Sequence, residues 1–140
     1  MVGVKEDYKN VIHPLLQNIE NNITNMLRDH PCGENKKKYT CDPNNETRSI
    51  QKMVCSIPFK NPKKVMSKIK CDLWKLSGVI TDSLECSCSI NEDPYNSTRG
   101  IQFNCTHPHH RHLSDERLCR LRSIIRDIKS CYAKLTVKNS

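Results

Sequence analysis

Residues 114–135 read SDERLCRLRSIIRDIKSCYAKL and predict one long amphipathic helix. Ser114 is a good N-cap, and Asp115 and Glu116 suit the positive end of the helix dipole. Two cysteines, Cys119 and Cys131, lie on this helix, so we expect covalent links from it to other parts of the chain. Apolar side chains recur three or four positions apart, which places them on one buried face: Leu118, Leu121, Ile124, Ile125, Ile128, Tyr132 and Leu135.

The nine cysteines indicate a protein held together by disulfide bonds in an oxidising compartment. Only 36% of the 140 residues are hydrophobic, below the usual ~45–50%, so a single domain over residues 1–140 has a thin core. Each closed bridge adds on the order of 2–4 kcal/mol to such a fold. Structural zinc is the alternative use of cysteine, but the sequence holds no CxxC pair, only the CxC of Cys86 and Cys88. Nine is odd, so at least one thiol is unpaired or bonded to another molecule.

Three further helices are expected before residue 114. The first covers about residues 5–28, where Pro14 should kink the helix or mark its true start. The second spans residues 46–56 with Ile50, Met53 and Val54 facing inward. The apolar face of the first helix consists of Tyr8, Val11, Ile12, Leu15, Leu16, Ile19, Ile23, Met26 and Leu27.

The third helix is expected to start at Asn61-Pro62, an N-cap followed by proline at the first helical position. It runs to Gly78, with an extension toward Leu84 that bends at the glycine. Residues 86–112 read as a long irregular connection, and strand-like alternation is nearly absent. Long helices with one long crossover predict an all-α, disulfide-stabilised four-helix bundle, compatible with an up-up-down-down course. The apolar stripe of this third helix is Val65, Met66, Ile69, Leu73 and Leu76.

Four Asn-x-Ser/Thr sequons, at Asn22, Asn45, Asn96 and Asn104, support secretion and glycosylation because four exceed the chance rate for this length. No apolar run approaches the ~20 residues of a membrane span, so we expect no membrane insertion. The start, Met1-Val-Gly-Val, is followed at once by charged residues. We interpret it as a mature N-terminus with an added initiator methionine.

The net charge of +8 suggests nucleic acid, an anionic polysaccharide or an acidic receptor surface as partner. Aromatic residues are only 5% and no recognition motif is present, so nucleic acid is not expected. Two loops, together with Lys63, Lys64 and the arginines of the last helix, form a candidate heparan sulfate site. Its loop residues are Lys36, Lys37, Lys38, His107, His109, His110, Arg111 and His112.

The histidine run is also an alternative zinc or copper site, but its spacing through a proline disfavours a preformed metal geometry, so no metal and no cofactor are expected. The sequence has no GxSxG, no HExxH and no phosphate-cradling glycine loop. We therefore expect a protein without catalytic residues, not an enzyme.

Residues 118–135, LCRLRSIIRDIKSCYAKL, resemble the last helix of the interleukin-7 and thymic stromal lymphopoietin family of short-chain cytokines. That family has LC, a basic-aliphatic run, EIK or a close variant, and then a cysteine followed by an aromatic residue. Residues 41–46, CDPNNE, are similar to the family's CDANKE, residues 8–12, YKNVI, to its YESVL, and residues 104–106 to its NCT. The interval from Cys41 to Cys86 also equals the family's interval between the corresponding cysteines.

The chain departs from the family pattern at several cysteines. The family's early cysteine before the first helix is absent, and Cys55, Cys71 and Cys88 have no counterpart. Cys86 and Cys105 compete for one family position. The resemblance implies the bonds Cys32–Cys119 and Cys41–Cys131, with other pairs drawn from Cys55, Cys71, Cys86, Cys88 and Cys105.

The resemblance further implies a secreted, up-up-down-down cytokine that bridges an interleukin-7 receptor alpha-like chain and a common gamma-like chain to start lymphoid signalling. Gln17, Asn18 and Asn21 match positions that face the alpha chain, and Trp74 and Lys75 would complete that face. Arg122, Lys129 and Tyr132 are candidates for the common chain, although Tyr132 is equally a core-edge residue. The alternatives are another short-chain cytokine, of thymic stromal lymphopoietin-like or interleukin-4-like type, or a basic disulfide-rich protein for polysaccharide binding or host defence.

Overall fold

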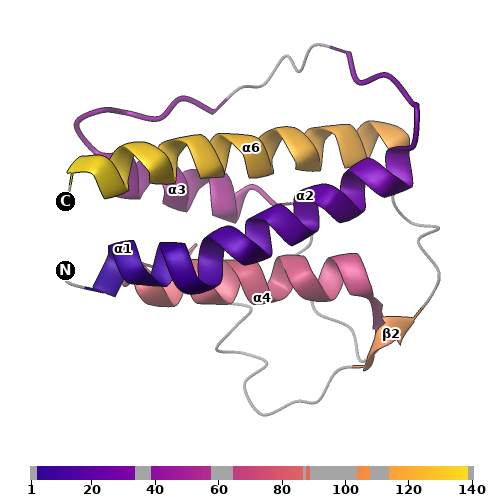
Figure 1. Ribbon diagram of the computed structural model, residues 1–140, viewed down its shortest axis with the longest axis horizontal. Coiled ribbons are helices and arrows are strands. Elements are labelled where there is room, and N and C mark those ends of the chain that lie inside the picture. The colour runs from indigo at the N-terminus through magenta and orange to yellow at the C-terminus, as the bar shows by residue number, and fades with distance from the viewer. Residues whose placement is uncertain are drawn as a thin grey trace.

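The computed structural model describes residues 3–33, 39–57, 65–86, 88, 104–107 and 114–138, and for Val65–Ser67, Asn104–His107 and Lys138 it describes the backbone alone. Within these ranges the regular secondary structure is helical apart from one pair of short strands (Figure 1). None of the described helices is both long and apolar enough to cross a membrane. The elements are α1 (Gly3–Asp7), η1 (Tyr8–Ile12), α2 (His13–Leu27), α3 (Glu46–Cys55), β1 (Val65–Ser67), α4 (Lys68–Ser83), β2 (Asn104–His107) and α6 (Asp115–Lys138).

The irregularity predicted at Pro14 takes the form of a π turn. The segments α1, η1 and α2 follow one another without a gap, and η1 is a wider π-helical turn that ends two residues before the proline. Proline cannot donate to the carbonyl of Asn10 and its ring would press on it, so a wider turn relieves the conflict. The extra residue in this turn rotates Val11 outward to 48% exposure, so its predicted place on the buried face is wrong.

Side-chain caps are present at the starts of α3 and α6, and the one at α6 was predicted from the sequence. The Asn45 side chain accepts a hydrogen bond from the backbone N–H of Arg48 at 3.1 Å, and α3 begins at the next residue, Glu46. Ser114 caps α6 in the same way, because its Oγ accepts from the N–H of Arg117 at 3.2 Å. In α3 the three side chains expected inward, Ile50, Met53 and Val54, are all buried.

The start of the third helix differs from the prediction. It begins at Lys68, and Val65 and Met66 belong to β1, which pairs in parallel with β2. The predicted start at Asn61-Pro62 lies outside the described residues. The two strands are only three and four residues long and lie about forty positions apart, so their pairing leaves no alternating pattern in the sequence. At the other end, α4 continues through the buried Gly78 to Ser83.

The helices pack around one core in a set of four neighbouring pairs: α2 with α6, α3 with α6, α2 with α4, and α3 with α4. The end of α4 meets the start of the chain, where Ser83 Oγ donates to the Asp7 carboxylate at 2.8 Å. The start of α3 meets the end of α6, where Cys131 Sγ lies 3.6 Å from the Glu46 carbonyl oxygen. Figure 1 shows the first turn of α1 and the last turns of α6 at the same end of the molecule. This arrangement is compatible with a four-helix bundle.

Two disulfide bonds hold α6 near its two ends. Cys32–Cys119 joins the segment after α2 to the second turn of α6, and Cys41–Cys131 joins the segment before α3 to its later half. These are the pairings that the family resemblance implies. The bonded cysteines are 87 and 90 positions apart in the sequence. A bond that closes a long loop lowers the conformational entropy of the unfolded chain more than one that closes a short loop, and so stabilises the fold more.

The cysteines without a family counterpart also form bonds. Cys55, at the end of α3, is bonded to Cys88, and Cys71 on α4 is disulfide-bonded as well. Among the cysteines whose side chains are described, Cys86 carries a free thiol. It is half-buried and packs against the edge of the core.

The aromatic contact at the end of the core joins the first and last helical segments. The Tyr132 ring is fully buried and stacks on Tyr8, with ring centroids 4.6 Å apart and planes inclined by 10°. The Tyr132 hydroxyl is buried and has no hydrogen-bond partner in the described part of the chain. Burial therefore removes this hydroxyl from water and gives it no hydrogen bond within the described residues in exchange, which lowers the stability of the fold.

We expect Tyr132→Phe to leave the free energy of unfolding unchanged or to raise it, because the substitution removes only the unpartnered hydroxyl. Tyr132→Ala should lower it by about 3–5 kcal/mol through the cavity it creates. Urea unfolding followed by circular dichroism measures both changes. A loss of more than about 1 kcal/mol in Tyr132→Phe would show that the hydroxyl has a partner.

Cys86 should react slowly with iodoacetamide at neutral pH. Burial raises the pKa of its thiol, so the reactive thiolate is scarce until the pH approaches that raised value. Peptide mapping by mass spectrometry should find the label on Cys86, with a rate that increases with pH and increases strongly in urea. Labelling of Cys55 or Cys88 in the native protein would contradict the pairing.

Candidate functional site

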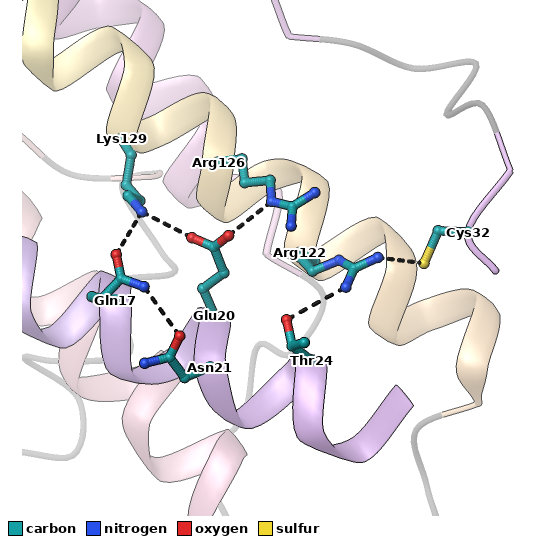
Figure 2. Close-up of polar contacts among 8 residues, drawn as sticks. All are labelled: Gln17, Glu20, Asn21, Thr24, Cys32, Arg122, Arg126 and Lys129. Carbon is teal, nitrogen blue, oxygen red and sulfur yellow. Dashed lines mark hydrogen bonds and ion pairs between the residues drawn. The ribbon is translucent and has the colours of Figure 1, made fainter. Parts of the chain in front are cut away.

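Polar side chains of α2 and α6 meet along the line where the two helices pack. On α2, residues 17, 20 and 24 are three and four positions apart and therefore share one helical face. On α6, residues 129, 126 and 122 share a face for the same reason. We call this surface the α2–α6 strip (Figure 2), and it consists of Gln17, Glu20, Asn21, Thr24, Arg122, Arg126 and Lys129.

Glu20 is the centre of the strip. Its carboxylate accepts from Arg126 Nε at 2.8 Å and from Lys129 Nζ at 2.9 Å. The side chain is only 14% exposed. Burial alone would raise the pKa of this carboxyl, but the hydrogen bonds and charges of Arg126 and Lys129 outweigh it and leave the pKa below its ordinary value. Glu20 is therefore ionised at neutral pH and links two cations.

Amide side chains continue the network toward the N-terminal part of α2. Lys129 Nζ also donates to Gln17 Oε1 at 2.8 Å, and Gln17 Nε2 donates to Asn21 Oδ1 at 3.1 Å. Asn21 is exposed at the outer edge of the strip (Figure 2). Asn18 is exposed on the same helix.

Arg122 closes the strip at the end where the chain leaves α2. One terminal nitrogen donates to Thr24 Oγ1 at 3.4 Å, and the other to Cys32 Sγ at 3.0 Å. Cys32 is bonded to Cys119, three positions before Arg122 on α6. The disulfide thus helps to hold the guanidinium in place on the surface.

The structure regroups the receptor-binding candidates. Gln17 and Asn21, expected to face one receptor chain, share a hydrogen-bond network with Lys129, expected to face another. Trp74 and Lys75 lie on α4, outside the strip, where Trp74 is half-buried and Lys75 is exposed. A division between a first-helix face and a last-helix face therefore does not describe this surface.

The interpretation of Tyr132 as an exposed receptor anchor is wrong, because its side chain is 0% exposed and stacks on Tyr8 in the core. The alternative prediction placed Tyr132 at the edge of the core, and the structure buries it more deeply than that. Tyr132 lies on the apolar face of α6 by helical periodicity, and this face packs against the core.

The remaining predicted sites are described only in part. Asn45 is exposed at the start of α3, and Asn22 is half-buried in α2. Asn96 and the side chain of Asn104 lie outside the described residues. The same holds for every loop residue of the heparan sulfate candidate: Lys36, Lys37, Lys38, Lys63, Lys64, the side chain of His107, His109, His110, Arg111 and His112.

Two members of the strip, Glu20 and Thr24, were not predicted from the sequence, and Arg126 was expected only as one of the last-helix arginines of the heparan sulfate candidate. A lone glutamate on a polar helix surface gives no local signal of a partner a hundred positions away. The signal that could have found it is the bond between Cys32 and Cys119, which fixes the register of two antiparallel helices.

Comparison with known proteins found no matching family model, no matching curated protein and no matching solved structure.

The charge of Glu20 should make the strip stabilising at neutral pH and less so in acid. A carboxylate whose folded-state pKa is lowered adds stability above its unfolded pKa of roughly 4.3, and this is lost as the pH falls through the lowered value. Glu20→Gln should therefore be less stable than the parent protein at pH 7, and the difference should shrink at pH 2. Thermal unfolding at both pH values measures it.

Glu116→Gln is the matched control for this prediction. Glu116 pairs with Arg120 on the same helix, but the two side chains are 79% and 62% exposed, so the pair adds little stability. A difference between Glu20→Gln and the parent protein that persisted undiminished at pH 2 would show that the charge of Glu20 is not its source.

Proposed function

We propose that this protein is a secreted, glycosylated four-helix cytokine of the interleukin-7 type that acts by binding two receptor chains at once. The observation that carries the proposal is the way the helices are paired. Both α2 and α3 pack on α4 and on α6. In an up-up-down-down bundle the first two helices are diagonal to each other, and each lies between the third and the fourth. The pairing supports that course.

The ends of the helices support the same topology. Equal steps forward on α2 and backward on α6 connect Gln17 with Lys129 and Thr24 with Arg122, so these helices run antiparallel. The end of α4 lies beside α1, which places α4 antiparallel to the first helical segment as well. Two parallel helices followed by two that return require long connections, and residues 28–45 and 84–114 supply them.

The disulfide bonds support a secreted ligand. The pairs Cys32–Cys119 and Cys41–Cys131 agree with the bonds implied by the resemblance of residues 118–135 to the interleukin-7 family. Stable disulfides are typical of proteins that work outside the reducing cytosol. The sequons at Asn22, Asn45, Asn96 and Asn104 fit the same route.

Receptor binding is assigned to two surfaces. The α2–α6 strip is ordered by hydrogen bonds between its own side chains, so it loses little conformational freedom on binding. The exposed side of α4 that carries Lys75 forms the second surface, on a different helix. Each surface would bind one receptor chain, an interleukin-7 receptor alpha-like chain or a common gamma-like chain, and signalling would start when both are held together.

Binding to the two receptor ectodomains from the same species, measured by surface plasmon resonance, tests this function. Asn21→Trp places a bulky side chain at the edge of the strip, and Lys75→Trp places the same group on α4. We expect each variant to weaken binding to one ectodomain at least tenfold and to leave binding to the other unchanged.

Unaltered circular dichroism spectra serve as the control for folding, since both positions are exposed. The proposed function fails if the parent protein binds neither ectodomain. The assignment of two separate surfaces fails if both variants weaken binding to the same chain.

A further inference from the structure

The α2–α6 strip carries more positive than negative charge. It holds three cations, Arg122, Arg126 and Lys129, and one carboxylate, that of Glu20, which contacts Arg126 and Lys129. Lys129 is largely satisfied within the strip, since it donates to Glu20 and to Gln17 and its side chain is 24% exposed. The excess charge therefore belongs to the two arginines.

Arg126 binds Glu20 through only one of its nitrogens. Its Nε donates to the carboxylate, while the side chain remains 56% exposed. Figure 2 shows its two terminal nitrogens directed away from Glu20, and the described part of the chain gives them no partner. Paired N–H groups of this kind match a carboxylate in a two-bond geometry.

Arg122 donates to neutral atoms, the Thr24 hydroxyl and the sulfur of Cys32. These contacts orient the guanidinium without neutralising it. Because a disulfide and a helix hold both acceptors, the charge stays in place before any partner arrives. An ordered cation of this kind costs less conformational entropy to bind than a free surface arginine.

We propose that the strip binds an acidic protein surface that presents carboxylates opposite Arg122 and Arg126, one helical turn or about 6 Å apart along α6. This inference rests on the proposed receptor-binding function and names the chemistry of the receptor surface that meets the strip. It also assigns Glu20 a positioning role, in which it orients Arg126 and limits the net charge of the site.

The composition of the strip favours a protein over a sulfated polysaccharide. A uniformly anionic chain lying along α6 would meet the carboxylate of Glu20 between Arg126 and Lys129. Gln17 and Asn21 add amide groups that both donate and accept hydrogen bonds, as a protein surface of mixed polarity requires. A charged group of each sign in one small area is suited to a partner with a defined pattern.

Association with the receptor ectodomain whose binding is weakened by Asn21→Trp tests the proposal. Arg126→Glu should lower the association rate at least tenfold at 50 mM NaCl, and the effect should shrink at 500 mM NaCl because salt screens exposed charges. Glu20→Gln should raise the rate, because it removes the negative charge within the strip. Arg126→Gln, which makes the smaller change, should fall between the parent protein and Arg126→Glu.

Arg120→Glu is the matched control, because Arg120 is an exposed arginine of the same helix that pairs with Glu116 outside the strip. It changes the net charge by the same amount and should alter the rate less than threefold. Equal effects of Arg120→Glu and Arg126→Glu would overturn the proposal while leaving the receptor function intact. Absence of binding by the parent protein would instead overturn the function itself.

A heparin dodecasaccharide tests the alternative partner. It should bind the parent protein and Arg126→Glu equally, since the strip is not its site. A tenfold loss of heparin binding in Arg126→Glu, with unchanged receptor association, would assign the strip to a polysaccharide and overturn the proposal.

Discussion

The bond between Cys32 and Cys119 sets the relation between the first and last long helices, on which the surface chemistry depends. It joins the chain just after α2 to the second turn of α6, so one end of an antiparallel pair is fixed. From there each step back along α2 is matched by an equal step forward along α6. Thr24 thus meets Arg122, Glu20 meets Arg126, and the next step brings Gln17 to Lys129. Cys41–Cys131 holds the other half of α6 and brings α3 alongside.

Much of the fold could be predicted from local patterns, because apolar periodicity and capping residues indicate helices in the sequence. The last helix begins after its predicted cap, Ser114, and the short helix α3 begins at the predicted residue 46. The errors had one distant and one local cause. Val65 and Met66 fit a helical stripe, yet a distant segment pairs with them as a strand. Val11 fits the stripe of an ideal helix, and the π turn before Pro14 rotates it outward.

The site was less predictable than the fold, because a polar residue on a helix surface carries no information about its partner across the interface. Gln17, Arg122 and Lys129 were selected through a family resemblance, whereas Glu20 required knowledge of the register between two helices. Tyr132 shows a different error. The family resemblance around Cys131 favoured a surface role for it, whereas its position on the apolar stripe of the helix places it in the core.

The stacking of Tyr8 on Tyr132 has a consequence for the connectivity of the chain. It joins η1 to the later half of α6 with ring centroids 4.6 Å apart, and Figure 1 shows α1 and the last turns of α6 at the same end of the molecule. A short linker could therefore join the two ends, and new termini could be opened in a loop, to give a circularly permuted protein with the same helix contacts. A fusion partner attached near either of these ends would likewise project away from the Cys32–Cys119 bond, which joins the segment after α2 to α6.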